Sequence, residues 1–158
     1  MIGFTRKEKS KRAAKSVSRL ATPSLPENKS AGDVGAELLR QYQEWRQSLQ
    51  TPAQRMALIR NICDRIAEKC RPEQIILFGS HAYGTPTLES DLDLLVVMPF
   101  AGSPLSQAVN ISRQLKLMIP LDLIVRTRAQ VNERLAIDDF FMREIVERGK
   151  VMYEAPDR

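Results

Sequence analysis

Residues 75–97 read IILFGSHAYGTPTLESDLDLLVV, and this stretch decides the fold. Two apolar runs flank a turn of small residues and a pair of carboxylates, and the β-branched and large aliphatic side chains in both runs favour strands. Gly84 and Pro86 interrupt the segment between the runs and indicate a turn. We therefore predict two strands, at about 74–78 and 92–98, with polar residues gathered where the first strand ends and the second begins.

Asp91 and Asp93 are the first candidate site residues. Alternate side chains of a strand face the same way, so the two carboxylates project to one face, about 6–7 Å apart. At an effective dielectric of ~20 they repel each other by roughly 2–3 kcal/mol, a cost for which folding alone gives no reason. A divalent cation removes the repulsion, and a pair of carboxylates favours Mg²⁺, with Mn²⁺ as the alternative, over zinc.

Gly79 and Ser80 form the other half of the candidate site, because they lie where the first strand ends and a short helical turn is expected. Glycine lets the backbone approach a ligand closely, and the free N–H groups of a new helical turn bind anions. Phosphate is the natural occupant beside Mg²⁺. Together the two halves predict a site for a nucleoside triphosphate, suited to in-line attack at a phosphorus. His81, the sole histidine, either contacts a phosphate or the acceptor there or is an exposed turn residue.

The spacing of these residues resembles the signature of the DNA polymerase β-like nucleotidyltransferases, and in particular of the small bacterial and archaeal minimal nucleotidyltransferases. Ten residues separate Gly79-Ser80 from Asp91-x-Asp93 in an apolar strand, and a similar apolar run follows at residues 121–125. The resemblance covers about residues 55–155. It implies a nucleotidyltransferase fold of the α/β (α+β) class, a small mixed sheet flanked by helices.

The same resemblance implies roles for the site residues. Asp91 and Asp93 would bridge two Mg²⁺ ions, and the backbone amides of Gly79 and Ser80, with the Ser80 hydroxyl, would hold the β- and γ-phosphates. Asp91, Asp93 and Asp122 are the catalytic and metal-binding residues that we expect.

Asp122 lies in a third predicted strand and has apolar residues on both sides. A carboxylate in such a strand is rarely buried without a partner. One interpretation is a structural salt bridge to Arg126 or Arg128, and the other is a third acidic residue of the metal site. The resemblance favours the metal site, because family members carry an acidic residue on this strand that binds the catalytic metal and helps to activate the attacking hydroxyl.

The positive charge of the chain is concentrated near its N-terminus. The net charge is +5, but residues 1–30 hold eight Lys and Arg against two Glu, which leaves 16 basic and 17 acidic residues in the remainder. We expect residues 1–32 to be a disordered basic tail: a solvated leader, an arm for nucleic acid or an acidic partner, or a transit peptide. We do not expect the folded domain, residues 33–158, to bind nucleic acid.

Helical periodicity accounts for most of the rest of the domain, which we divide into an accessory helix at 33–50 and a motif-bearing core at 52–155. The accessory helix packs on the core or, through Tyr42 and Trp45, on a partner. A capping box at Thr51 starts the next helix. A further helix is predicted from Ser103 to Pro120, with a buried stripe of Leu105, Ala108, Val109, Leu115 and Ile119.

After the third strand we predict one helix or two short ones, with Asp138 as a cap and Gly149 at the end, and then a short strand at 151–153. Cys63 and Cys70 lie about 10 Å apart along a helix, too far for a disulfide, so both are expected to be reduced core residues of a cytoplasmic protein. No run of 18 or more apolar residues is present, so we do not expect a membrane protein.

The resemblance implies an Mg²⁺-dependent enzyme that moves a nucleoside monophosphate, AMP from ATP, to an acceptor hydroxyl. Since only 36 residues follow Asp122 (158 − 122), we expect the acceptor to be shaped by a second copy of the chain or by a different protein. Minimal nucleotidyltransferases commonly work with a HEPN-type toxin and add AMP to one of its tyrosines. We expect such a partner to dock over Asp122.

Other functions compete with this one. The chain could be a non-catalytic antitoxin module that acts by contact with its toxin, or a nucleotidyltransferase acting on a small molecule. A polymerase of the poly(A) or tRNA-end type is least favoured, because those relatives add large RNA-binding regions. Metal-dependent binding of a nucleoside triphosphate separates an enzyme from a contact-only antitoxin.

Overall fold

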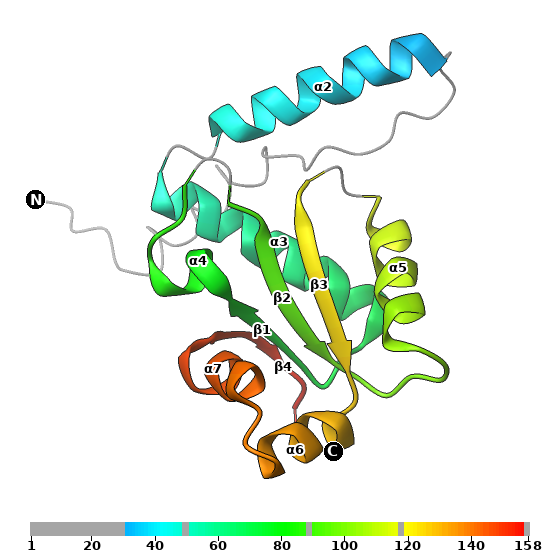
Figure 1. The fold of residues 1–158 in the computed structure, drawn as a ribbon. Coiled ribbons are helices and arrows are strands. Elements are labelled where there is room, and N and C mark those ends of the chain that lie inside the picture. Colours follow the sequence, from blue (N-terminus) through cyan, green and yellow to red (C-terminus); the bar gives the residue numbers. More distant parts are fainter. Residues whose placement is uncertain (1–30, 49–50, 88–89, 117–118, 157–158) are drawn as a thin grey trace, which may run out of the picture.

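A mixed sheet of four strands organises the chain in the computed structural model, which describes residues 31–48, 51–87, 90–116 and 119–156. The strands are β1 (Gln74–Phe78), β2 (Leu92–Val97), β3 (Leu121–Arg126) and β4 (Lys150–Glu154), in the spatial order β3-β2-β1-β4. β1 pairs antiparallel with both β2 and β4, and β2 pairs parallel with β3. The small mixed sheet expected from the sequence is confirmed (Figure 1).

Helices lie on both faces of this sheet. The helices in the described part of the chain are α2 (Ala31–Ser48), α3 (Pro52–Cys70), α4 (Gly79–Tyr83), α5 (Pro104–Leu115), α6 (Arg128–Ala136) and α7 (Phe140–Arg148). α3 and α5 pack on one face, and α6 and α7 on the other (Figure 1). Within the ranges that the structure describes, no helix is long and apolar enough to cross a membrane.

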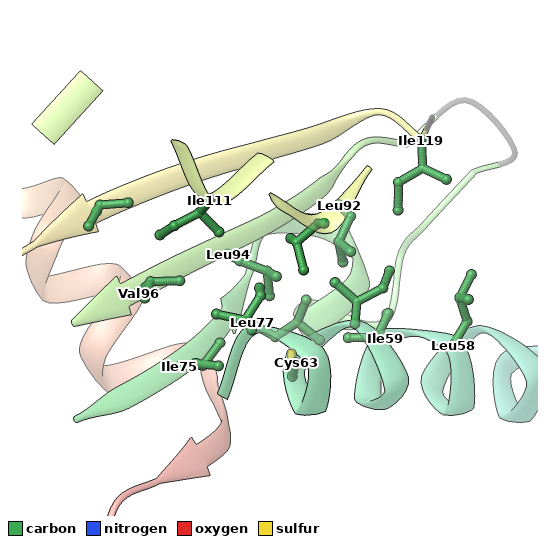
Figure 2. Close-up of a cluster of buried hydrophobic side chains, with 14 of the residues drawn as sticks. Leu58, Ile59, Cys63, Ile75, Leu77, Leu92, Leu94, Val96, Ile111 and Ile119 are labelled. Carbon is green, nitrogen blue, oxygen red and sulfur yellow. The ribbon is translucent and has the colours of Figure 1, made fainter. Parts of the chain in front are cut away.

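The larger core lies between α3, α5 and the sheet. α3 begins at the predicted capping box, in which the Thr51 hydroxyl accepts from the Gln54 N–H at 3.2 Å and the Gln54 side chain accepts from the Thr51 N–H at 3.1 Å. Its apolar face includes Cys63, which is buried and free of any disulfide, as predicted. Figure 2 shows this face packed against residues of β1, β2 and α5: Ile75, Leu77, Leu94, Val96 and Ile111. Each such aliphatic side chain stabilises the fold by about 1.5–3 kcal/mol.

A second, smaller core covers the opposite face. Ile76 and Phe78 of β1 and Leu95 and Val97 of β2 alternate with the residues of the first core and pack against α6 and α7. Val131, Met142 and Ile145 are the buried helix residues there. Because both faces are covered, β1 and β2 read as continuous apolar runs, which explains why their sequence signal is strong.

The prediction for α5 was partly wrong. The helix starts at Pro104 with Ser103 as its cap, as expected, but it ends at Leu115, before Pro120. Lys116 takes a left-handed conformation (φ 50°), and the Arg65 guanidinium donates to the Leu115 carbonyl at 2.5 Å, which satisfies one of the last carbonyls of the helix. Leu105 and Val109 are exposed, and the buried stripe runs instead through Ala108, Ile111 and Leu115.

The cap predicted for the last helix was also misplaced by one residue. The structure has two helices, and the N-cap of α7 is Asp139, whose carboxylate accepts from the Met142 N–H at 2.8 Å. Asp138 instead adopts a left-handed conformation (φ 63°) in the connection between the helices. Aspartate tolerates this conformation, so the chain turns at Asp138 and the next residue becomes the cap.

The accessory helix is present as α2, which begins at Ala31 rather than Asp33. Leu39 is exposed, and the Arg46 guanidinium lies over the Tyr42 ring at 5.7 Å. The Trp45 side chain, and the tail predicted at 1–32 except for its last two residues, lie outside the described residues. The predictions made for them therefore remain predictions.

Candidate active site

Strand pairing brings two of the predicted carboxylates together. Asp93 on β2 is the register partner of Asp122 on β3, and on its other side it is the partner of Phe78, the last residue of β1. Partners on neighbouring strands point to the same face of a sheet, so the two carboxylates project together, on the face that carries α6 and α7. Asp91 directly precedes β2. Asp93 is half-buried, whereas Asp91 and Asp122 are exposed, so the group opens to solvent.

Gly79 packs directly against the Asp93 side chain. A Cβ atom at Gly79 would lie 2.9 Å from Cγ of Asp93 and closer still to its Oδ2. Gly79 also has a φ of +66°, in the left-handed region that favours glycine. The glycine predicted for close approach to a ligand is therefore required by the apo fold as well, because it leaves room for the central carboxylate.

The turn after β1 is the short helix α4, as the sequence predicted. Its N-cap residue, Phe78, makes no side-chain hydrogen bond to the start of the helix. Gly84 ends the helix in a left-handed conformation (φ 88°), and its N–H bonds to the Ser80 carbonyl. Gly79 and Ser80 thus stand at the end of β1, beside Asp93 on the neighbouring strand.

The three carboxylates interact electrostatically. The pKa of Asp93 is raised above its usual value, first by burial, then by the negative charge of Asp122 and then by that of Asp91. The cluster therefore holds repelling charges in the metal-free protein, as the sequence predicted. Asp122 takes part in none of the ion pairs found among the described residues. Its predicted alternative role in a salt bridge to Arg126 or Arg128 is not seen there.

Whether these residues fit a metal depends on the metal. Among the described side chains, no group of three or more His, Cys, Asp or Glu is gathered closely enough to hold an ion by itself. Zinc and calcium sites need such a group, but Mg²⁺ keeps several waters and is commonly bound by one or two carboxylates plus substrate phosphates. Paired Asp93 and Asp122 beside an exposed Asp91 fit a magnesium that arrives with a nucleotide.

His81 links α4 to the loop that leads to Asp91. Its Nε2 atom lies 3.4 Å from the Ser90 carbonyl, and the ring is half-buried. Burial lowers the pKa of His81, the Ser90 carbonyl raises it, and the nearby charge of Arg55 lowers it again, with a net decrease. The contact with Ser90 connects α4 to the loop that carries Asp91. Sequence reasoning did not identify Arg55, on the first turns of α3, as a neighbour of this turn.

A groove of about 570 Å³ lies between α5 and β3, and Asp122 is one of the residues that line it. Arg113 of α5 and Lys116, the C-cap of that helix, line this groove together with Val109. The groove could not be predicted from local sequence patterns, because it depends on how α5 packs beside β3.

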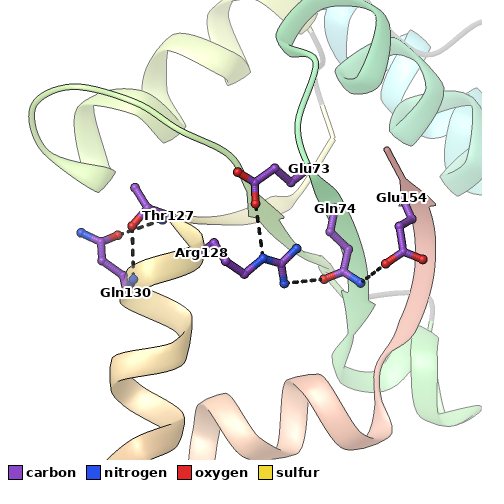
Figure 3. A network of polar contacts seen from close by, with 6 residues as sticks. All are labelled: Glu73, Gln74, Thr127, Arg128, Gln130 and Glu154. Carbon is purple, nitrogen blue, oxygen red and sulfur yellow. Dashed lines mark hydrogen bonds and ion pairs between the residues drawn. The ribbon is translucent and has the colours of Figure 1, made fainter. Parts of the chain in front are cut away.

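The opposite end of the sheet holds a polar network that has no part in the carboxylate cluster. Arg128 donates to Glu73 and to Gln74, and Gln74 donates to Glu154, each at 3.3 Å (Figure 3). The network connects the start of α6 to β1 and β4, with the partners exposed. Arg128, one of the two residues predicted as salt-bridge partners of Asp122, therefore contacts Glu73 and Gln74 instead.

Comparison with known proteins gives the family. The family described as "Polymerase beta, Nucleotidyltransferase" matches residues 60–158. A protein of Methanocaldococcus jannaschii named "Putative protein adenylyltransferase" is 33% identical over 85 residues, covering 52% of this chain and 80% of that protein. The crystal structure of a "putative nucleotidyltransferase" from Sulfolobus solfataricus matches with a TM-score of 0.49 at 18% identity, over 68% of this chain and 86% of that one.

The chain therefore belongs to the polymerase beta nucleotidyltransferase family, since the match spans well over half of its length, and it is a nucleotidyltransferase. The family implies a nucleotide substrate, and its members generally use divalent metals. All five predicted site residues lie inside the matched range: Gly79, Ser80, Asp91, Asp93 and Asp122.

Proposed function

We propose that this nucleotidyltransferase moves AMP from ATP to a hydroxyl group of a partner protein, a tyrosine, in an Mg²⁺-dependent reaction. The observation that carries the proposal is the pairing of Asp93 with Asp122 across β2 and β3, beside Gly79 and Ser80. The name of the archaeal relative, which specifies adenylyl transfer to protein, supports ATP as donor and a protein as acceptor.

The proposed roles are those that the family resemblance implies, and the positions of the residues support them. Asp91 and Asp93 would hold the metal ions, and Asp122 would complete the ligand set. When bound, Mg²⁺ neutralises charge on the triphosphate and on the departing pyrophosphate. The amides of Gly79 and Ser80 and the Ser80 hydroxyl hold the β- and γ-phosphates at the end of β1, which orients the α-phosphorus toward the carboxylates.

The transfer is a single displacement. The tyrosine oxygen forms a bond to the α-phosphorus, the bond between that phosphorus and the α,β-bridging oxygen breaks, and pyrophosphate leaves. Asp122, exposed at the acceptor side, orients the hydroxyl and receives its proton, which then passes to solvent. The His81 ring lies against the Ser90 carbonyl, so we assign it the positioning of α4 and of the loop before Asp91.

The partner that we propose is a HEPN-type toxin, because the minimal nucleotidyltransferases that the motif resembles commonly work with one. Transfer of AMP to the toxin would silence it. Incubation of the full chain with ATP, Mg²⁺ and the product of the neighbouring gene, followed by intact-mass spectrometry of both proteins, tests this function.

The expected result is an AMP adduct on the partner that disappears with Asp93→Asn and persists with Glu68→Gln, a control at an exposed carboxylate of α3. Peptide mapping should place the adduct on a tyrosine. Efficient modification of a small molecule with no adduct on any protein would refute the proposed acceptor, and full activity in Asp93→Asn would refute the proposed site.

A further inference from the structure

β3 stands at one end of the strand order, so in the described part of the chain it has a paired strand on one side only. The carbonyls of Pro120 and Arg126 accept from Leu92 and Met98 of the β2 side, each at 3.0 Å. In a parallel ladder every second residue bonds to a given neighbour, so the backbone groups of Leu121 and Leu123, which alternate with these, point away from β2.

The far end of this edge is closed by the protein itself. The Arg126 guanidinium donates to the Val125 carbonyl at 2.7 Å. Side chains that occupy edge groups are one way in which proteins prevent strand addition. The backbone groups of Leu121 and Leu123, on either side of Asp122, are therefore the part of this edge with which an added strand could pair.

The groove of about 570 Å³ lies along this edge. Leu121, Asp122 and Leu123 are consecutive, and their side chains point alternately to opposite faces, yet all three line the groove. The groove therefore runs around the edge of β3 and is not confined to one face of the sheet. Its other wall includes Arg113 and Lys116.

We propose that an extended segment of the protein acceptor adds antiparallel to this edge of β3, with its acceptor tyrosine opposite Asp122 and acidic residues on either side of that tyrosine. This inference rests on the proposed function. Side chains directly opposite each other in a sheet have Cβ atoms about 4.5–5.5 Å apart and share a face. The tyrosine opposite Asp122 would thus lie on the carboxylate face, and its two neighbours would point toward α5.

Charge distinguishes three possible occupants of the groove: a segment of the protein acceptor, the chain's own residues 1–30 and a second copy of the chain. Acidic neighbours of the tyrosine would enter the groove beside Arg113 and Lys116. The chain's own residues 1–30 hold eight basic and two acidic residues, which makes them a poor match for these cations. A second copy paired through β3 would bring Asp122 near its own counterpart and the two basic walls near each other, and like charges across strands are destabilising.

Backbone methylation of a model peptide tests the pairing directly. With the tyrosine opposite Asp122, the peptide residues on either side bond to Leu121 and Leu123, whereas the tyrosine N–H points away from β3. A labelled peptide with a Glu-Tyr-Glu core should bind the full chain in the presence of Mg²⁺ and a non-hydrolysable ATP analogue. N-methylation of a flanking residue should weaken binding about tenfold or more, and N-methylation of the tyrosine should leave it unchanged.

Charge reversal provides the second test. Arg113→Glu should weaken binding of the Glu-Tyr-Glu peptide about tenfold and favour a Lys-Tyr-Lys peptide, while Arg60→Glu, a control at an exposed position of α3, should change neither. Melting temperatures and binding of the ATP analogue should be equal in the two variants.

The outcomes separate this inference from the proposed function. Peptide binding with the expected methylation pattern but no AMP transfer would refute the proposed function and leave the docking site in place. AMP transfer to the partner protein, together with peptide binding that neither flanking methylation nor Arg113→Glu weakens, would overturn the docking site. So would a dimer in solution that Arg113→Glu dissociates, because β3 would then be occupied by a second copy.

Discussion

Replacing Gly79 by alanine tests the packing at the centre of the site in the absence of any ligand. Gly79→Ala must place a Cβ in a left-handed backbone conformation, at a cost of about 1–2 kcal/mol. The same Cβ meets the Asp93 carboxylate, with Cγ 2.9 Å away, and forcing this side chain aside costs about a further 1–3 kcal/mol. We therefore expect Gly79→Ala to lower the free energy of unfolding by about 2–5 kcal/mol in total.

Gly84→Ala is the matched control for the conformational part of this cost. Gly84 also has a positive φ, +88°, but among the described residues, its own chain neighbours apart, no atom lies within 4 Å of a Cβ built there. Its replacement should cost only about 1–2 kcal/mol. In the double variant Gly79→Ala/Asp93→Ala the carboxylate is gone and only the Asp93 Cβ, 3.3 Å away, remains, so the excess cost of Gly79→Ala should largely disappear.

Urea unfolding of five proteins gives the required free energies: the wild type, Gly79→Ala, Asp93→Ala, the double variant and the control Gly84→Ala. Unfolding is followed by far-ultraviolet circular dichroism in metal-free buffer. A positive coupling of about 1–3 kcal/mol between positions 79 and 93 is expected. If Gly79→Ala costs no more than Gly84→Ala, or if the cost is the same with and without the Asp93 carboxylate, the close packing described here is wrong.

Three further perturbations have defined outcomes. Since burial and two like charges raise the pKa of Asp93, the metal-free protein should lose stability as pH rises through that raised value. The urea midpoint of Asp93→Asn should not show this loss. The pKa of His81 is lowered, so the free energy of unfolding should fall as pH drops below about 6.5. If His81→Asn loses as much stability as the wild type over this pH range, the prediction is wrong. Arg128→Ala should lower the free energy of unfolding, measured with denaturant, by less than about 1 kcal/mol, because its ion pair with Glu73 is exposed. It should also leave AMP transfer intact, and a loss of transfer would contradict the separation of this ion pair from the carboxylates.

Local chemistry made much of the fold predictable from sequence. The capping box at Thr51, the continuous apolar runs of β1 and β2 and the glycine turn at Gly84 each depend on residues close in the chain, and each was found as expected. The end of α5 was not predictable in this way. One contact at that end comes from Arg65, 50 residues earlier in the chain, which donates to the Leu115 carbonyl.

The candidate site likewise combines local features that could be predicted with long-range features that could not. Its residue types and spacing were visible in the sequence, because repelling carboxylates and a Gly-Ser turn are local features. The register that pairs Asp93 with Asp122 is a long-range property of β2 and β3, and so is the groove that joins Asp122 to Arg113. A pattern of side chains cannot specify such pairings when several registers bury the same apolar residues.

Binding of a non-hydrolysable ATP analogue, measured by isothermal titration calorimetry with and without Mg²⁺, tests most directly whether these residues form a metal-dependent nucleotide site. Mg²⁺ should strengthen binding to the wild-type chain at least about tenfold, and Asp93→Asn should remove this gain while Glu68→Gln keeps it. Equal affinity with and without Mg²⁺, or an undiminished effect of Mg²⁺ in Asp93→Asn, would contradict the assignment of the site.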